Sequence, residues 1–319
     1  MIYNSASFFL LSKGYIMEIN KDELKSQALS LVEKVKQDKK VAIGVIAGAV
    51  LFVLAIVVFL ASGPSKPKTP QEQFRALLSQ AVNNDSNLNK ILKGFKLDED
   101  KLEIVRDHYK KMFDDELLDF YVKKLDEKGV FKSKKLDKKV AFATAFKTMN
   151  DIAVEGMLKT SAEDREAFFN YNKTLITTLS PRTCKMYVIG DPRLFAEREM
   201  QLSSSRVFKK MTKDQLEAYL AAQRAAAHSV VKGNIKSLTL TKEQAERAGS
   251  LLESANEKQM QQLPAFKQKK IANAANDLTR AMPMDACDFG KFVYKSADSI
   301  KDPADREIVI LNLLGAAQQ

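Results

Sequence analysis

The chain has 319 residues, with 51 Lys and Arg against 40 Asp and Glu, a formal net charge of +11 and an apolar content of 45%. The basic residues are interspersed with acidic ones and form no arginine-rich block, which argues against a nucleic-acid-binding protein. Glycine and proline are few, at 12 and 8 residues, which disfavours a sheet-rich fold and favours helices. The interspersed charges favour an ordinary solvated surface, and the alternative is an anionic partner of the cell envelope, such as lipid headgroups or cell-wall polymers.

Residues 1–40 are predicted to form an amino-terminal cytoplasmic tail. Translation starts at Met1 or at Met17, and the sequence does not decide between them. Asn20 is a candidate helix cap, and Leu24, Leu31 and Val35 belong to an apolar stripe at helical spacing. We expect an amphipathic helix here that continues into the membrane, the alternative being an interfacial or partner-binding helix.

Residues 41–62 are predicted to form a transmembrane helix. Positions 41–61 contain no charged side chain, and 21 helical residues span roughly the 30 Å of a bilayer core. Four lysines precede this segment within residues 34–40, whereas only Lys66 and Lys68 follow closely. The positive-inside rule therefore predicts an uncleaved signal anchor in the bacterial inner membrane, with the amino terminus cytoplasmic and the carboxyl-terminal domain periplasmic.

Gly44 and Gly48 lie four residues apart within this span. Small residues at that spacing let two membrane helices approach closely. We therefore expect Gly44 and Gly48 to pack against a protein partner or a second copy of the chain, the alternative being glycines that face lipid.

A linker is predicted at residues 63–69, and an all-α soluble domain at residues 70–319. Residues 63–68 contain only Gly, Pro, Ser and Lys, and Thr69 begins a capping box that closes at Glu72. Thr212 and Thr241 begin two further, nearly identical capping boxes. The strand-like residues 186–189 stand alone, which favours a helix end or a buried connector over a sheet.

The only cysteines, Cys184 and Cys287, each follow a helix and a proline. This shared context hints at two similar helical lobes, about 70–200 and 201–319. An exported domain with two cysteines also permits one disulfide between Cys184 and Cys287, the alternative being two buried thiols.

Catalytic and metal-binding patterns are missing from the sequence, so no catalytic residue, cofactor or metal ligand is predicted. The two histidines, His108 and His228, lack metal-ligand spacing, and we expect structural or exposed roles for them. Asp114, Asp115 and Glu116 fit the start of a helix. Glu253 followed by Ser254 is a weak match to some peptidoglycan-cleaving enzymes, which use such a glutamate as an acid.

These features predict a single-pass inner-membrane protein rather than an enzyme. Its helical periplasmic domain would be a binding or scaffolding module at the cell envelope. Two alternatives remain open at this point. One is an envelope enzyme that acts on cell-wall polymer with a glutamate as acid or base, and the other is a membrane-anchored adaptor that faces the cytosol.

Overall fold

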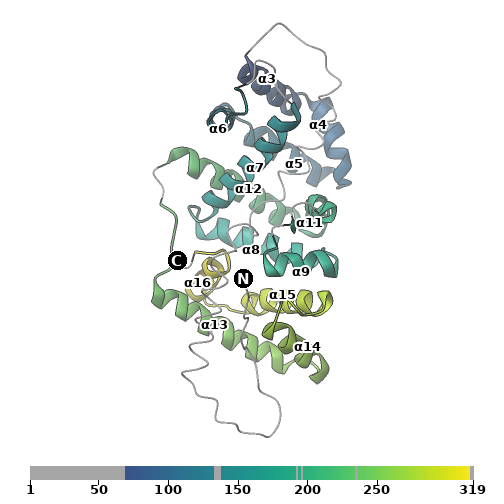
Figure 1. Cartoon of the computed structure of the whole chain (residues 1–319), viewed down its shortest axis with the longest axis vertical. Helices are drawn as coiled ribbons and strands as arrows, with labels where there is room; N and C mark the ends of the chain where they lie inside the picture. Colours follow the sequence, from purple (N-terminus) through teal and green to yellow (C-terminus); the bar gives the residue numbers. More distant parts are fainter. Residues whose placement is uncertain (1–68, 133–137, 192, 195–196, 234–235, 317–319) are drawn as a thin grey trace. The chain divides into compact units, whose positions relative to one another are not determined.

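The computed structural model describes residues 69–132, 138–191, 193–194, 197–233 and 236–316 (Figure 1). Within these ranges every regular element is a helix, which confirms the all-α prediction for this part of the chain. Leu240, whose backbone N–H donates to the carbonyl of Ala316, forms an isolated bridge there and not a strand.

The predicted tail at 1–40, the predicted span at 41–62 and the linker up to residue 68 lie outside the described residues. Gly44 and Gly48 therefore lie outside them too. Among the helices that are described, none combines the length and the apolar composition that crossing a bilayer requires.

The described residues form two compact units, and each unit is built from two separate stretches of the chain. Unit 1 contains residues 172–200 and 238–316, and unit 2 contains residues 69–171 and 201–237, in both cases with the gaps given above. Both units thus take residues from either side of residue 200.

Unit 2 is formed by these helices: α3 (Pro70–Asn83), α4 (Asp85–Leu92), the short η2 (Lys93–Phe95), α5 (Glu99–Met112), α6 (Asp115–Glu127), α7 (Lys138–Met157), most of α8 (Ala162–Ile176), α11 (Ser203–Lys210) and α12 (Lys213–Lys232). Unit 1 is formed by the end of α8 and these helices: α9 (Pro181–Ile189), α10 (Arg198–Gln201, whose last residue belongs to unit 2), α13 (Lys242–Gln261), α14 (Ala265–Asn276), α15 (Pro283–Asp298) and α16 (Pro303–Leu313).

Threonine caps start several of these helices as the sequence predicts. Thr212 and Thr241 each accept a hydrogen bond from the backbone N–H of the glutamine three residues later, and that glutamine accepts one from the threonine backbone. Thr69 and Glu72 make the same reciprocal pair before α3, at 3.3 and 3.0 Å. Each box satisfies two backbone donors that a helix start otherwise leaves unpaired.

Residues 186–189 form the last turn of α9, which confirms the prediction of a helix end. Ser180 caps the start of this helix, and Pro181 occupies its first position. Gly190 ends it at a φ of 69°, a left-handed conformation that glycine adopts without a steric penalty.

The core of unit 2 is rich in aromatic side chains. The rings of Tyr171 and Tyr219 stack with their centroids 4.0 Å apart, and Phe168 meets Tyr219 edge to face at 5.8 Å. Val105 and Tyr109 of α5 are buried as well. Aromatic pairs of this kind add to the stabilisation that burial alone provides.

In unit 1, α9 packs closely on α15. A Cβ atom added to Gly290 of α15 would lie 2.4 Å from a methyl carbon of Val188 and 2.7 Å from one of Ile176. A larger residue at position 290 would therefore require the side chains of Val188 and Ile176 to move. A second apolar cluster joins α13, α14 and α15 through Met260, Ile271 and Phe292.

Candidate binding surface

Cys184 and Cys287, the pair proposed from the sequence, lie together in unit 1. Their sulfurs form a disulfide between α9 and α15, and their Cα atoms are 5.3 Å apart. Both residues are almost completely buried. The bond joins the same two helices that approach each other at Gly290, so α9 and α15 are linked covalently as well as by packing.

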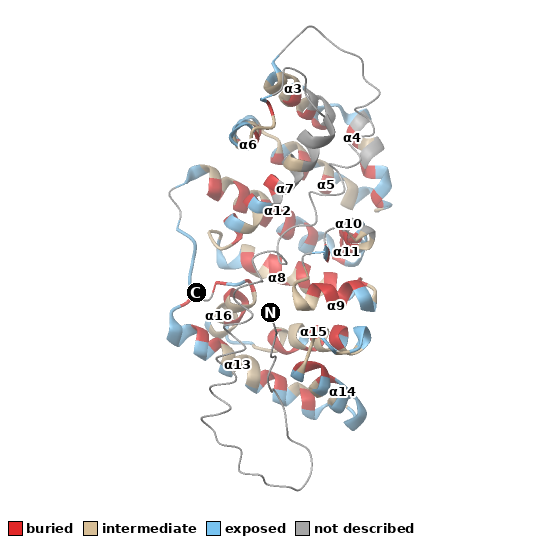
Figure 2. Cartoon of the chain, viewed as in Figure 1, coloured by how far each residue is buried: buried red, intermediate tan, exposed pale blue. Residues whose placement is uncertain are grey.

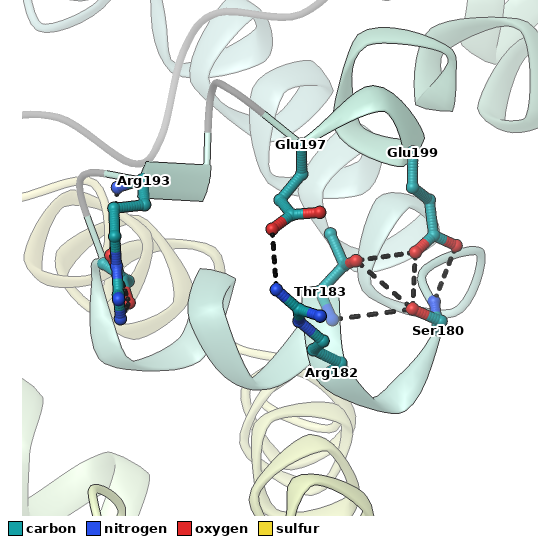
Figure 3. Close-up of polar contacts among 7 residues, drawn as sticks. Ser180, Arg182, Thr183, Arg193, Glu197 and Glu199 are labelled. Carbon is teal, nitrogen blue, oxygen red and sulfur yellow. Dashed lines mark hydrogen bonds and ion pairs between the residues drawn. The ribbon is translucent and has the colours of Figure 1, made fainter.

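A network of polar side chains surrounds the start of α9 (Figure 3). The carboxylate of Glu199 accepts a 2.8 Å hydrogen bond from the backbone N–H of Ser180 and a 2.6 Å bond from the hydroxyl of Thr183. The hydroxyl of Ser180 donates to the same carboxylate. Glu199 therefore serves as a second cap for α9, and its carboxylate holds α10 against this helix.

Two ion pairs extend this network. Arg182 contacts Glu197 at 3.2 Å, and Arg193 contacts Asp191 at 2.6 Å (Figure 3). The hydrogen bond from Arg193 lowers the pKa of Asp191 below its usual value. The carboxylates of Glu197 and Asp191 are thus each paired with an arginine. We therefore assign the polar contacts around α9 a structural role.

The strongest candidate for a binding site lies on α14 and at the start of α15. The three most exposed large apolar side chains of the described residues are Met282, Phe266 and Met284, with exposed fractions of 69%, 62% and 56%. Phe266 is exposed on α14, with Lys269 and Lys270 three and four residues further on. Residues at these spacings are neighbours on one helix face. Figure 2 shows exposed positions along this helix. We call residues 264–285 the α14–α15 surface.

The α14–α15 surface is held by polar contacts at its base. The ammonium group of Lys185 on α9 donates to the carbonyls of Thr279 and Ala281, both at 2.7 Å. Lys270 and Asp285 form an ion pair at 3.8 Å, which brings the face that carries Phe266 beside the start of α15. The exposed apolar side chains are therefore presented from a fixed backbone.

The sequence does not single out this surface, although a signal is present. Pro264 begins a helix in which an aromatic residue is followed by Lys267, Lys269 and Lys270. At helical spacing, Phe266 falls on the same side of α14 as Lys269 and Lys270. The buried face of the helix carries Ile271 and Ala274. A large aromatic residue on the polar side of an amphipathic helix is the feature that could have identified it.

His108, for which a structural or exposed role is expected, is buried in unit 2. Its Nδ1 lies 3.1 Å from a guanidinium nitrogen of Arg224, and its ring meets that of Tyr109 edge to face. Burial, together with the charge of Arg224, lowers the pKa of His108 to about 3. An imidazole that stays neutral over the physiological range and has an arginine at its edge is a structural group.

The structure brings His228 together with two acids that the sequence places far away. Its ring nitrogens lie 3.4 Å from the carboxylates of Asp114 and Glu116 at the start of α6. Asp114 also caps α6 by accepting from the backbone N–H of Leu117, which agrees with the expected helix start. Asp115 instead pairs with Arg75 at 2.9 Å.

Glu253, the remaining candidate acid, lies half-buried on α13. Burial and the neighbouring Glu257 raise its pKa. Ser254 beside it is exposed. Within the described ranges, no cluster of His, Cys, Asp and Glu is arranged to hold a metal ion.

Comparisons of this chain with protein-family models, with curated proteins and with solved structures found no match. What the chain does must therefore be inferred from its own residues.

Proposed function

We propose that the chain is a single-pass protein of the bacterial inner membrane whose helical periplasmic domain is a binding or scaffolding module. The observation that carries the binding role is the α14–α15 surface, because the three most exposed large apolar side chains of the described residues all occur within it, together with exposed lysines. Exposed apolar side chains that gather in one place, beside polar ones, are typical of interaction surfaces.

The membrane location is supported by the sequence of residues 41–61, which lack any charged side chain. The periplasmic side is supported by the lysines that precede this segment. The disulfide between Cys184 and Cys287 adds to this argument, because disulfides persist in oxidising compartments such as the periplasm and are rare in the cytosol.

An envelope enzyme that uses Glu253 as its acid is the second candidate. The raised pKa of Glu253 favours it, since a general acid must hold its proton near neutral pH. Glu253 is only half-buried, which weighs against this candidate, because catalytic glutamates with strongly raised pKa values are desolvated. The α14–α15 surface makes the binding module the better supported of the two.

A topology experiment tests the proposal. Alkaline phosphatase, which folds only outside the cytosol, and green fluorescent protein are fused separately after Gln319 of the full chain. We expect an active phosphatase and a dark fluorescent protein, and the opposite results for matched fusions after residue 40. A fluorescent fusion after Gln319 with an inactive phosphatase would place the domain in the cytosol and overturn the proposal.

A further inference from the structure

The α14–α15 surface combines apolar and basic side chains in a pattern that indicates the chemistry of its partner. Four basic residues, Lys267, Lys269, Lys270 and Arg280, occur within residues 264–285, against Asp277 and Asp285. Both acids are neutralised locally, Asp277 by Arg280 at 3.4 Å and Asp285 by Lys270 at 3.8 Å. The charge that remains for a partner is therefore positive.

Lys267 and Lys269 carry that charge. Both are exposed, and neither forms an ion pair with any residue in the described part of the chain. An anionic partner could contact both ammonium groups without breaking an existing ion pair. The surface is thus complementary to negative charge and at the same time offers apolar side chains for burial.

We propose that the α14–α15 surface docks onto an anionic lipid surface, with Phe266, Met282 and Met284 entering the headgroup region and Lys267 and Lys269 contacting lipid phosphates. The proposal rests on the proposed function, because a membrane anchor keeps the domain close to lipid.

The composition of the surface favours lipid over a protein partner. Phe and Met are enriched in protein–protein interfaces, but lysine is depleted there. Helices that lie in the membrane interface, by contrast, combine lysines on the polar side with bulky apolar side chains that enter the acyl boundary. On α14, Phe266 shares the exposed side of the helix with Lys269 and Lys270, so bulky apolar and basic side chains are likewise presented together.

The fixed backbone adds to the argument. Lys185 holds the connection between α14 and α15 through two carbonyls, and the side chain of Asp277 accepts hydrogen bonds from the backbone of Thr279 and Arg280. Met282 follows directly after this connection. A surface that is ordered before binding loses less conformational entropy when its side chains enter lipid.

The test uses the absence of tryptophan from the whole chain. The full chain with Phe266→Trp is held in phosphatidylcholine nanodiscs, so that residues 41–62 do not report on added lipid. Vesicles with equal parts of phosphatidylglycerol and brominated phosphatidylcholine are then titrated in. We expect the tryptophan emission to shift to the blue and to be quenched, and both effects to weaken with added salt.

Matched variants test whether binding depends on the charges of the α14–α15 surface and whether this surface is the part that enters lipid. In the Phe266→Trp chain, Lys267→Gln with Lys269→Gln should weaken binding on the order of 30-fold, since each lysine near an anionic surface contributes about a fivefold factor. Lys123→Gln with Lys232→Gln removes the same charge from exposed positions of unit 2 and should leave binding unchanged. Leu202→Trp, at a side chain 43% exposed, should show no quenching.

Each contrary outcome has a defined meaning. If the emission of the Phe266→Trp chain does not respond to phosphatidylglycerol, or if both lysine pairs cause an equal loss of binding, the proposal is overturned. A response to soluble polyglutamate and not to vesicles would assign the surface to an acidic protein and also overturn it. If the chain stays in solution without nanodiscs, the anchoring proposal fails separately, and the same titration is carried out on the free chain.

Discussion

At the scale of single residues, His108 shows how burial sets a protonation state. It is 2% exposed in the core of unit 2, and its Nδ1 lies 3.1 Å from a guanidinium nitrogen of Arg224. Desolvation is the first cause of its lowered pKa and the charge of Arg224 is the second, whereas a hydrogen bond to the backbone of Leu220 acts in the opposite direction. The neutral ring is therefore part of the folded state.

We expect this residue to make the protein less stable in acid. An unfolded histidine takes up its proton near pH 6.5, whereas the pKa of His108 in the folded chain is about 3. Between these values the unfolded state binds more protons, so the free energy of unfolding decreases as the pH falls. From pH 8 to pH 5 the decrease should be about 2 kcal/mol.

The measurement is urea unfolding of the full chain in detergent, followed by circular dichroism across this pH range. His108→Gln, which cannot take up a proton, should be less stable at pH 8 because it loses packing. It should also lack the decrease that His108 causes. An identical pH slope for the wild type and the variant would contradict the assignment.

At the scale of helices, α7 and α12 of unit 2 approach each other closely. A Cβ atom added to Gly156 would lie 1.9 Å from the carbonyl oxygen of Ala226, and the hydroxyl of Ser229 donates to that same carbonyl at 2.7 Å. The contact therefore involves backbone against backbone. A larger residue at position 156 can be accommodated only if the two helices move apart.

We expect Gly156→Ala to lower the free energy of unfolding by about 1–3 kcal/mol through overpacking. Gly249→Ala is the matched control, because a Cβ atom there meets nothing within 4 Å on helix α13. That substitution should raise stability by about 0.5–1 kcal/mol, the usual advantage of alanine over glycine in a helix. The measurement is the urea unfolding midpoint of each variant. If both substitutions change the free energy of unfolding in the same direction, the close approach at Gly156 is refuted.

The elements also show what could be predicted from the sequence and what could not. Capping boxes at Thr69, Thr212 and Thr241 depend on residues three apart, so local chemistry is sufficient to find them. The contact of His228 with Asp114 joins two helices that are far apart in the chain. No local pattern encodes such a pairing, and the same holds for the space that Gly156 leaves for Ala226.

The candidate site follows the same division. The sequence shows that Phe266 is followed by lysines. It does not show whether Phe266 is buried in the core or exposed as part of a binding surface. An aromatic residue on a helix is usually a core residue, and the burial of Phe168 and Phe169 fits that rule. Phe266 is an exception because its helix already buries Ile271 and Ala274 on the other side.

At the scale of the whole molecule, unit 1 is interrupted in sequence. Residues 201–237 belong to unit 2, and they separate α9 from α13, α14 and α15. The two parts of unit 1 must therefore find each other across an intervening segment. The disulfide between Cys184 and Cys287 joins these two parts covalently and closes a loop with a sequence separation of 103 residues.

We expect the double substitution Cys184→Ala with Cys287→Ala to lower the stability of unit 1 by about 4–5 kcal/mol, since a cross-link over about a hundred residues restricts the unfolded chain by that amount. The measurement is urea unfolding of the full chain with and without a phosphine reductant. Reduction should destabilise the wild type and leave the double variant unchanged, which separates the cross-link from general effects of the reductant.

Wild-type chain prepared from the envelope without reductant should also resist maleimide labelling in urea until it is reduced. Labelling of both cysteines before reduction would contradict the disulfide and remove its support for an exported domain, because thiols stay reduced in the cytosol.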